Sequence, residues 1–306
     1  MEARPTRLSS SAWEAAIGAA PIQHAWTYGA VAADFGAEPL RYELWSRGAR
    51  IGLSQCLMRR TRLGAVVLMP RPPVWDRAPR EGLVDAIRHV LPARAPRLFL
   101  APTGQGAPVL PLSRGREEAS LDLKPDPDTL RARLHGKWRN RLVRAEREGL
   151  VCRAVSGIPE WLIAREAAQR RAKGYAGLPP AWLRAWSRHG AILTLVAGAD
   201  GAEIAGMAFL VHGRAATYQV GWSSEEGRRR SAHNLLFWNA CIHLRAAGVE
   251  RLDLGRIARR HAPGLARFKL GTGAAIDRAP PIGLALPHAR LTSRLAGGFL
   301  FPDGVK

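Results

Sequence analysis

Apolar positions along the chain recur with two periods, one typical of helices and one typical of strands. The helical spacing predicts helices over 9–17, 22–36, 81–91, 126–148, 159–175, 180–187 and 231–247. Alternating or short apolar runs predict strands over 39–46, 50–59, 64–69, 97–101, 151–155, 191–197, 203–211, 215–222 and 251–254. Residues 102–119, rich in Gly, Pro and Ser, are interpreted as a connection. Antiparallel hairpins followed by helices indicate an α+β fold with mixed sheets.

One pattern occurs twice. The segment RGARIGLSQCLMRR (47–60) is similar to DGAEIAGMAFLVHG (200–213), about half a chain later. A repeat of this length predicts two copies of one domain rather than a solenoid. We therefore expect a first domain over 1–125, a second over 126–285 that carries the chemistry, and a C-terminal tail over 286–306.

The net charge of the chain indicates which classes of binding partner to expect. Lys and Arg number 46 against 25 Asp and Glu, so the formal net charge is +21. The excess reflects either the Arg usage of a GC-rich genome or an anionic partner, such as RNA, nucleotide phosphates or an acidic membrane surface. Three scattered cysteines (Cys56, Cys152, Cys241) fit reduced thiols. With no signal-peptide or membrane-spanning pattern, we expect a cytoplasmic protein that can work at the inner membrane surface.

The second half of the chain has the element order of the GNAT acyltransferase core: hairpin strands, a loop, a long helix and a further strand. In that fold the loop before the long helix offers backbone N–H groups to a pyrophosphate. Here the loop is SSEEGRRRSAHN (223–234), so phosphate or donor binding is expected at Arg228, Arg229, Arg230 and Ser231. The GNAT signature lacks its first Gly here, which leaves coenzyme A, a nucleic-acid phosphate and a plain exposed turn all open.

Four segments in order resemble the Fem-type aminoacyltransferases, tandem GNAT enzymes that build peptidoglycan bridges. They are QHAWTYGAV (23–31), LHGKWRNRLVRAEREGL (134–150), the 217–255 stretch beginning TYQVGWSS, and PGLARFKLGTG (263–273). The resemblance implies tandem GNAT-like domains and N-acyl transfer. It also implies an aminoacyl-tRNA donor and a UDP- or lipid-linked muropeptide acceptor. Members of the wider group imply an acyl-CoA-dependent N-acetyltransferase as the alternative.

The resemblance also assigns residues. Lys269 would stabilise the oxyanion of the tetrahedral intermediate, and Phe268 would wall the site. Lys137, Arg139, Asn140 and Arg141, on the predicted helix 126–148, would grip the acceptor's phosphates in a cleft between the domains. Tyr218 would contact substrate. The competing interpretations are a surface lysine, a solvated helix face and a core tyrosine.

Other chemistry is not indicated. The sequence has no metal-ligand spacing and no motif for a permanently bound cofactor. Where some Fem-type members carry a phosphate-binding lysine, this chain has Ala32, which argues against a UDP-linked or lipid-linked muropeptide as the acceptor. A non-catalytic nucleic-acid-binding protein remains a further alternative, because ten tryptophans are available to stack on bases.

Overall fold

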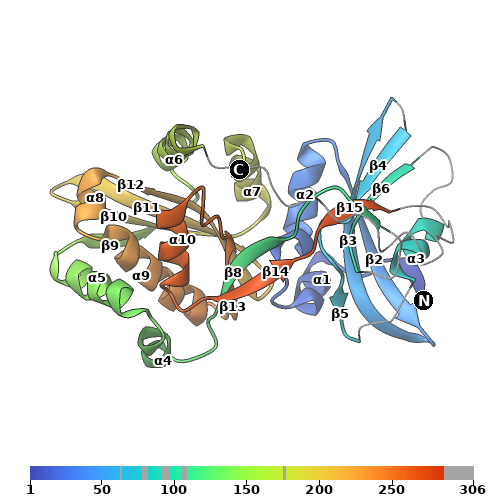
Figure 1. Cartoon of the computed structure of the whole chain (residues 1–306), viewed down its shortest axis with the longest axis horizontal. Helices are drawn as coiled ribbons and strands as arrows, with labels where there is room; N and C mark the ends of the chain where they lie inside the picture. The colour runs from blue at the N-terminus through green and yellow to red at the C-terminus, as the bar shows by residue number, and fades with distance from the viewer. Residues whose placement is uncertain (63, 78–81, 91–96, 105–108, 175–176, 286–306) are drawn as a thin grey trace, which may run out of the picture.

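The computed structural model describes residues 1–62, 64–77, 82–90, 97–104, 109–174 and 177–285, which form two lobes side by side (Figure 1). The first lobe is built from β1 (Glu2–Pro5), α1 (Ser10–Ile17), the 3-10 turn η1 (Ile22–His24), α2 (Trp26–Asp34), β2 (Glu38–Ser46), β3 (Ala49–Thr61), β4 (Gly64–Leu68), β5 (Val74–Trp75), α3 (Leu83–Val90), β6 (Arg97–Pro102) and β7 (Val109–Pro111).

The second lobe follows with a longer series of elements. They are β8 (Arg116–Asp122), α4 (Pro127–Ala132), α5 (Gly136–Arg147), β9 (Val151–Val155), α6 (Glu160–Lys173), α7 (Pro180–His189), β10 (Ile192–Ala199), β11 (Ala202–His212), β12 (Ala215–Ser223), α8 (Glu225–Arg229), α9 (Ala232–Ala246), β13 (Arg251–Arg256), α10 (Pro263–Leu270) and β14 (Ala275–Ala279). The chain then returns to the first lobe as β15 (Ile282–Ala285). The predicted meander strands and the long helix before β13 are present.

The two sheets share one topology, which confirms the predicted duplicated α+β fold. Their strand orders are β1-β2-β3-β4-β6-β15-β7 and β9-β10-β11-β12-β13-β8-β14. In each, three antiparallel strands are followed by a helix and then by a strand parallel to the third: β4 with β6, and β12 with β13. Helices α3 and α9 are the corresponding crossovers.

The matching hairpins explain the sequence repeat. The turn between β2 and β3 places Arg47 and Gly48 at φ 50° and 77°, and the turn between β10 and β11 places Asp200 and Gly201 at 51° and 80°. Two successive residues with positive φ are what a type I′ turn requires, and its twist suits a two-residue hairpin. The charged residue followed by Gly therefore occurs in both segments because both lobes form the same turn there.

The lobes exchange strands across the predicted domain boundaries. Strand β8 precedes residue 125 but pairs with β13 and β14 of the second sheet. Strand β15 follows the second lobe but pairs with β6 and β7 of the first. The interpretation of 102–119 as a connection is therefore wrong where β7 and the start of β8 lie. The predicted tail 286–306 lies outside the described residues.

The single helix predicted over 126–148 is also wrong. Asp126 caps α4 as expected, its side chain accepting the Thr129 N–H at 2.9 Å, but the helix ends at Ala132. A new helix begins at Gly136. The Arg139 guanidinium donates to the carbonyls of Ala132 (2.9 Å) and Leu134 (3.1 Å), the groups that the interruption leaves unpaired. Similarly, η1 and α2 replace the predicted helix 22–36.

Each lobe has its own apolar core, and two kinds of contact join them. One is apolar: Val31 of α2 packs in a buried cluster with Trp186 of α7 and Leu210 of β11. The other is an ion pair between Arg71, just after β4, and Glu118 of β8 at 2.7 Å, with 9% and 12% of the two side chains exposed. Both contacts involve strands of the second sheet, β11 and β8, and they hold the first lobe against that sheet.

Candidate active site

The site begins where β12 and β13 part. The two parallel strands pair only from Ala215 to Thr217 on β12 and from Arg251 to Asp253 on β13. A bulge at Gln219 follows, since Phe209 pairs with Tyr218 while its neighbour Ala208 pairs with Val220. Beyond Thr217 the backbone of β12 therefore has no ladder partner on its β13 side. Such a wedge at the carboxyl ends of parallel strands is a common place for a ligand to bind.

Lys269 lies at this wedge, on the β13 side. Helix α10 carries it, and only 7% of the residue is exposed. Its Nζ donates to the Arg256 carbonyl at 3.0 Å and lies 4.0 Å from the position that a β-carbon on Gly255 would occupy. A lysine ammonium has three N–H donors, so one bond to the protein leaves two for a substrate oxygen.

Burial and two acidic neighbours set the charge of Lys269. Desolvation lowers the pKa of its ammonium from 10.5 to about 8, while the negative charges of Asp253 and Glu118 oppose this shift. Asp253 is itself buried, and burial together with Glu118 raises the pKa of its carboxyl. Lys269 is therefore charged at neutral pH in a poorly solvated place, where a cation stabilises a nearby oxyanion most.

Phe268 packs beside the wedge with other rings. Its centroid lies 5.6 Å from that of Phe237, 5.8 Å from Trp138 and 6.2 Å from His233. His233 accompanies these rings in neutral form, because burial lowers its pKa to about 4. These contacts agree with the expected role of Phe268 as a wall of the site, and they are equally those of a residue that packs against the core.

Gly271 explains the spacing of the Phe-Lys-x-Gly segment. A β-carbon at Gly271 would lie 2.6 Å from Trp138 Cδ1 and 3.0 Å from the Arg267 carbonyl. The absence of a side chain therefore lets α10 approach the start of α5. Trp138 is buried in the core of the second lobe, so it has little room to move away.

We expect Gly271→Ala to destabilise the protein by about 1–3 kcal/mol, the usual cost of overpacking a filled core. Gly264→Ala, in the same helix but facing open space, is the matched control. Removing a helical glycine there should stabilise the fold by up to about 1 kcal/mol. Denaturant unfolding of both variants checks the pair, and equal effects would contradict the packing explanation.

Tyr218 lies on the β12 side of the wedge. It is half-buried, and its ring centroid is 5.5 Å from that of Phe209 in the core. A β-carbon on Gly221 would collide with its hydroxyl, so Gly221 makes room for this orientation. The position suits either substrate contact or packing.

The basic residues predicted on the helix are on the exposed face of α5, but not between the lobes. Lys137, Arg139, Asn140 and Arg141 are all exposed. Helix α5 packs on α9 at the end of the second lobe far from the first sheet (Figure 1). The structure therefore does not bring these residues to the cleft between the lobes, and Arg139 is occupied by the α4 carbonyls.

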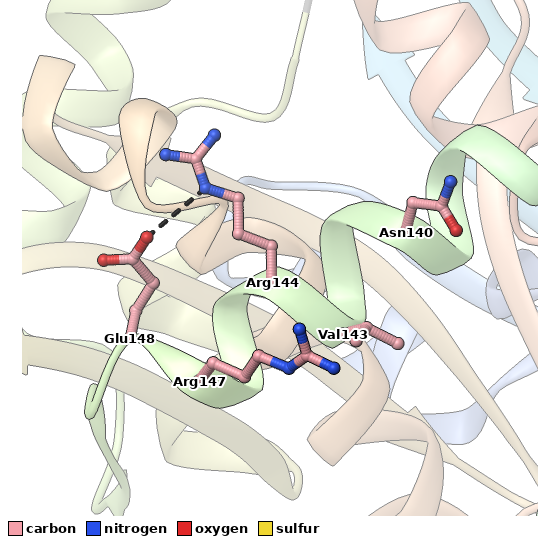
Figure 2. Close-up of a pocket in the computed structure, with 5 residues that line it drawn as sticks. All are labelled: Asn140, Val143, Arg144, Arg147 and Glu148. Carbon is pink, nitrogen blue, oxygen red and sulfur yellow. Dashed lines mark hydrogen bonds and ion pairs between the residues drawn. The ribbon is translucent and has the colours of Figure 1, made fainter.

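Instead, the C-terminal half of α5 borders an open hollow of about 290 Å³, lined by Asn140, Val143, Arg144, Arg147 and Glu148 (Figure 2). Arg144 donates to Glu148 at 3.3 Å, while the Arg147 guanidinium extends along the helix toward Val143 in this view. Two arginines and one glutamate are the charged side chains of this lining.

The loop before α9 is adjacent to this hollow. Arg230 lies 3.8 Å from Glu148 and also binds Glu226 at 2.6 Å. Arg228 donates to the Ser223 carbonyl at 2.7 Å, and Arg229 pairs with Glu226. Ser231, with φ 56°, begins α9 without a side-chain cap. The predicted phosphate-loop arginines thus make protein contacts, yet the loop and α5 form one continuous basic region.

Sequence reasoning missed the charged residues around Lys269: Asp253, Glu118 and Arg71. Asp253 carried a signal, because an acidic residue between Leu252 and Leu254 in a predicted buried strand needs an explanation. The sequence gives no signal for Glu118 and Arg71. They come into contact only because β8 joins the second sheet and the segment after β4 extends from the first lobe to β8.

No helix in the described part of the chain combines the length and apolarity needed to cross a bilayer. Within those same residues, no three His, Cys, Asp or Glu side chains are grouped as metal ligands would be.

Comparisons with known proteins agree with the topology. Residues 132–274 match the acetyltransferase (GNAT) domain family. The structure of FemX is similar over 94% of this chain and 98% of that chain, with a TM-score of 0.75 and 12% identity. A conserved protein of unknown function from Bacteroides thetaiotaomicron VPI-5482 is similar over 92% and 99%, with a TM-score of 0.58 and 9% identity. None of the curated protein sequences compared with the chain matches it.

The expected duplicated architecture is thereby confirmed: residues 132–274 are similar to the acetyltransferase (GNAT) domain family, within a two-lobed chain that has the fold of FemX.

Proposed function

We propose that the protein transfers an acyl group from an activated donor to an amine, with Lys269 stabilising the oxyanion. The observation that carries this proposal is a buried ammonium at the wedge between β12 and β13, with N–H donors to spare. Tetrahedral intermediates of acyl transfer gain most from a fixed donor in a site of low polarity. Phe268 walls the site and Tyr218 contacts the substrate from the β12 side.

The donor is aminoacyl-tRNA, held along the basic region of α5 and the loop before α9. Arg144, Arg147 and Arg230 are close enough to follow a phosphate backbone around the hollow. Lys137, Asn140 and Arg141 extend the same exposed face. Acyl-CoA is the alternative donor, because its diphosphate would use Ser231 and the first N–H groups of α9.

The acceptor amine belongs to a peptidoglycan precursor and enters from the side of the first lobe. The lobes enclose a small cavity of about 20 Å³ there, and its lining includes Arg71, Arg114 and Arg116. Arg114, rather than α5, would meet an acceptor phosphate there, since Arg71 and Arg116 already bind Glu118. The reaction takes place in the cytoplasm, where contact of the basic surface with anionic lipid would favour a lipid-linked acceptor.

A donor screen tests the function. The purified protein is incubated with a muropeptide amine and either charged tRNAs or acyl-CoA thioesters, and products are identified by mass spectrometry. We expect an amide product only with charged tRNA. Product only with acyl-CoA would overturn the donor assignment. Salt-sensitive RNA binding without any amide product would instead support a nucleic-acid-binding protein.

Replacing Arg144 and Arg147 together with Gln should weaken tRNA binding and lower its salt dependence. Each lost phosphate contact reduces the slope of log K against log salt by about 0.7–0.9, so we expect a decrease of about 1–2. Arg4→Gln with Arg60→Gln is the matched control, since it removes two exposed arginines from the first sheet. Equal losses in both double variants would show that only net charge matters.

A further inference from the structure

A buried carboxylate that the function does not yet use lies next to Lys269. Asp253 is 6% exposed and lies on β13, at the last position where that strand pairs with β12. One of its oxygens, Oδ1, accepts the Gly255 N–H at 2.8 Å, and Gly255 adopts φ 70° in the turn that this bond closes. No side-chain donor in the described residues binds this carboxylate.

Asp253 and Lys269 lie close together but not in contact. Both side chains bind neighbouring backbone groups: Asp253 accepts the Gly255 N–H, and Lys269 donates to the Arg256 carbonyl. Their opposite charges interact, yet no ion pair of 4 Å or less joins these two described side chains. The carboxylate and the ammonium are therefore not consumed in a direct ion pair, and both lie beside the backbone of Gly255 and Arg256.

Glu118, the other acidic group here, is already engaged. Its oxygens bind Arg71 at 2.7 and 2.9 Å and Arg116 at 2.7 Å. Two guanidiniums therefore neutralise it, and its place is structural. Asp253 is the buried carboxylate at the wedge that is free to take up a proton.

We propose that Asp253 is the general base that deprotonates the attacking amine, an inference that rests on the proposed acyl transfer. The carboxylate takes one proton from the acceptor ammonium, and the freed lone pair forms the C–N bond to the donor carbonyl. Lys269 stabilises the resulting oxyanion. When the intermediate collapses, the bond from carbon to the leaving oxygen of the ester breaks, and that oxygen takes the second proton of the nitrogen.

The electrostatic setting suits this role. Burial and the nearby Glu118 raise the pKa of Asp253, whereas Arg71 and Arg251 lower it, with Lys269 on the facing helix. A carboxylate with a raised pKa accepts a proton more readily than an exposed aspartate does.

Asp253→Asn is the direct test, because the amide oxygen can still accept the Gly255 N–H while the charge is lost. We expect kcat to fall by about 10²-fold or more, with the melting temperature unchanged within a few degrees. The acidic limb of the rate profile should disappear. The alkaline limb should move to lower pH, since Lys269 loses a negative neighbour that raises its pKa.

Asp122→Asn is the matched control, an exposed aspartate on the neighbouring strand β8, and it should leave both limbs unchanged. The assignment is overturned if Asp253→Asn retains kcat within fivefold, if its acidic limb persists, or if activity falls only in proportion to lost folded protein. Absence of any amide product from the unmodified protein in the donor screen would instead refute the proposed function itself, so the two failures are distinguishable.

Discussion

Replacing Lys269 with Met should lower kcat by about 10²–10³-fold while the protein stays folded. This decrease in kcat is the usual effect of removing one hydrogen-bond donor to the oxyanion in a buried site. Methionine has an unbranched stem of similar length, and among the described residues the side-chain hydrogen bond lost is that to the Arg256 carbonyl. Circular dichroism and single-turnover rates measure the two parts of the expectation.

The dependence of the rate on pH is a second test of the role of Lys269. Lys269 must be protonated to stabilise an oxyanion, and its pKa is about 8, so the rate of the natural protein should fall as the pH rises through 8. Lys124→Met, at an exposed lysine, should keep both the rate and this limb. If Lys269→Met matches that control, Lys269 has no role in the chemistry.

Replacing Glu118 with Gln should destabilise the fold by about 3–5 kcal/mol, because the buried Arg71 guanidinium loses its anion. Burial raises the pKa of Glu118, but the bonds and charges of Arg71 and Arg116 outweigh it and lower the pKa overall. The stabilisation is therefore complete above the ordinary carboxyl pKa and is lost as the pH falls through the lowered value.

Two companion variants make this expectation specific to the pair. Glu117→Gln breaks only a half-exposed contact to Arg259 at 3.6 Å and should cost less than about 1 kcal/mol. Arg71→Met combined with Glu118→Leu removes both charges and should recover most of the loss. Urea unfolding of the three variants gives the comparison, and a loss for Glu118→Gln no larger than that for Glu117→Gln would contradict a buried pair.

Local signals in the sequence were sufficient for most elements of the fold. The paired turns at Arg47-Gly48 and Asp200-Gly201 set both hairpins, and the Asp126 cap marked the start of α4. The break before α5 could not be predicted, because its cause is tertiary: the His135 N–H binds the Gly271 carbonyl at 2.9 Å, more than 130 residues further along the chain. A continuous helix would not make that bond.

The site was predictable only in part, for a similar reason. Lys269 was found through its resemblance to a family segment, and its burial came from the packing of α10 against the strand ends. The acidic residues beside it depend on β8 joining β13, a pairing between residues about 130 positions apart. The helix face of α5 was predicted correctly as basic, but its position relative to the first lobe depends on how α5 packs on α9.

The exchange of β8 and β15 has a consequence for synthesis on the ribosome. The second edge of strand β6 stays uncovered until β15 is made, 180 or more residues later. The N-terminal lobe therefore cannot finish folding while it emerges, unlike a self-contained domain. During that interval its exposed edge is open to wrong partners, so the nascent chain should rely on chaperones until β15 has been synthesised.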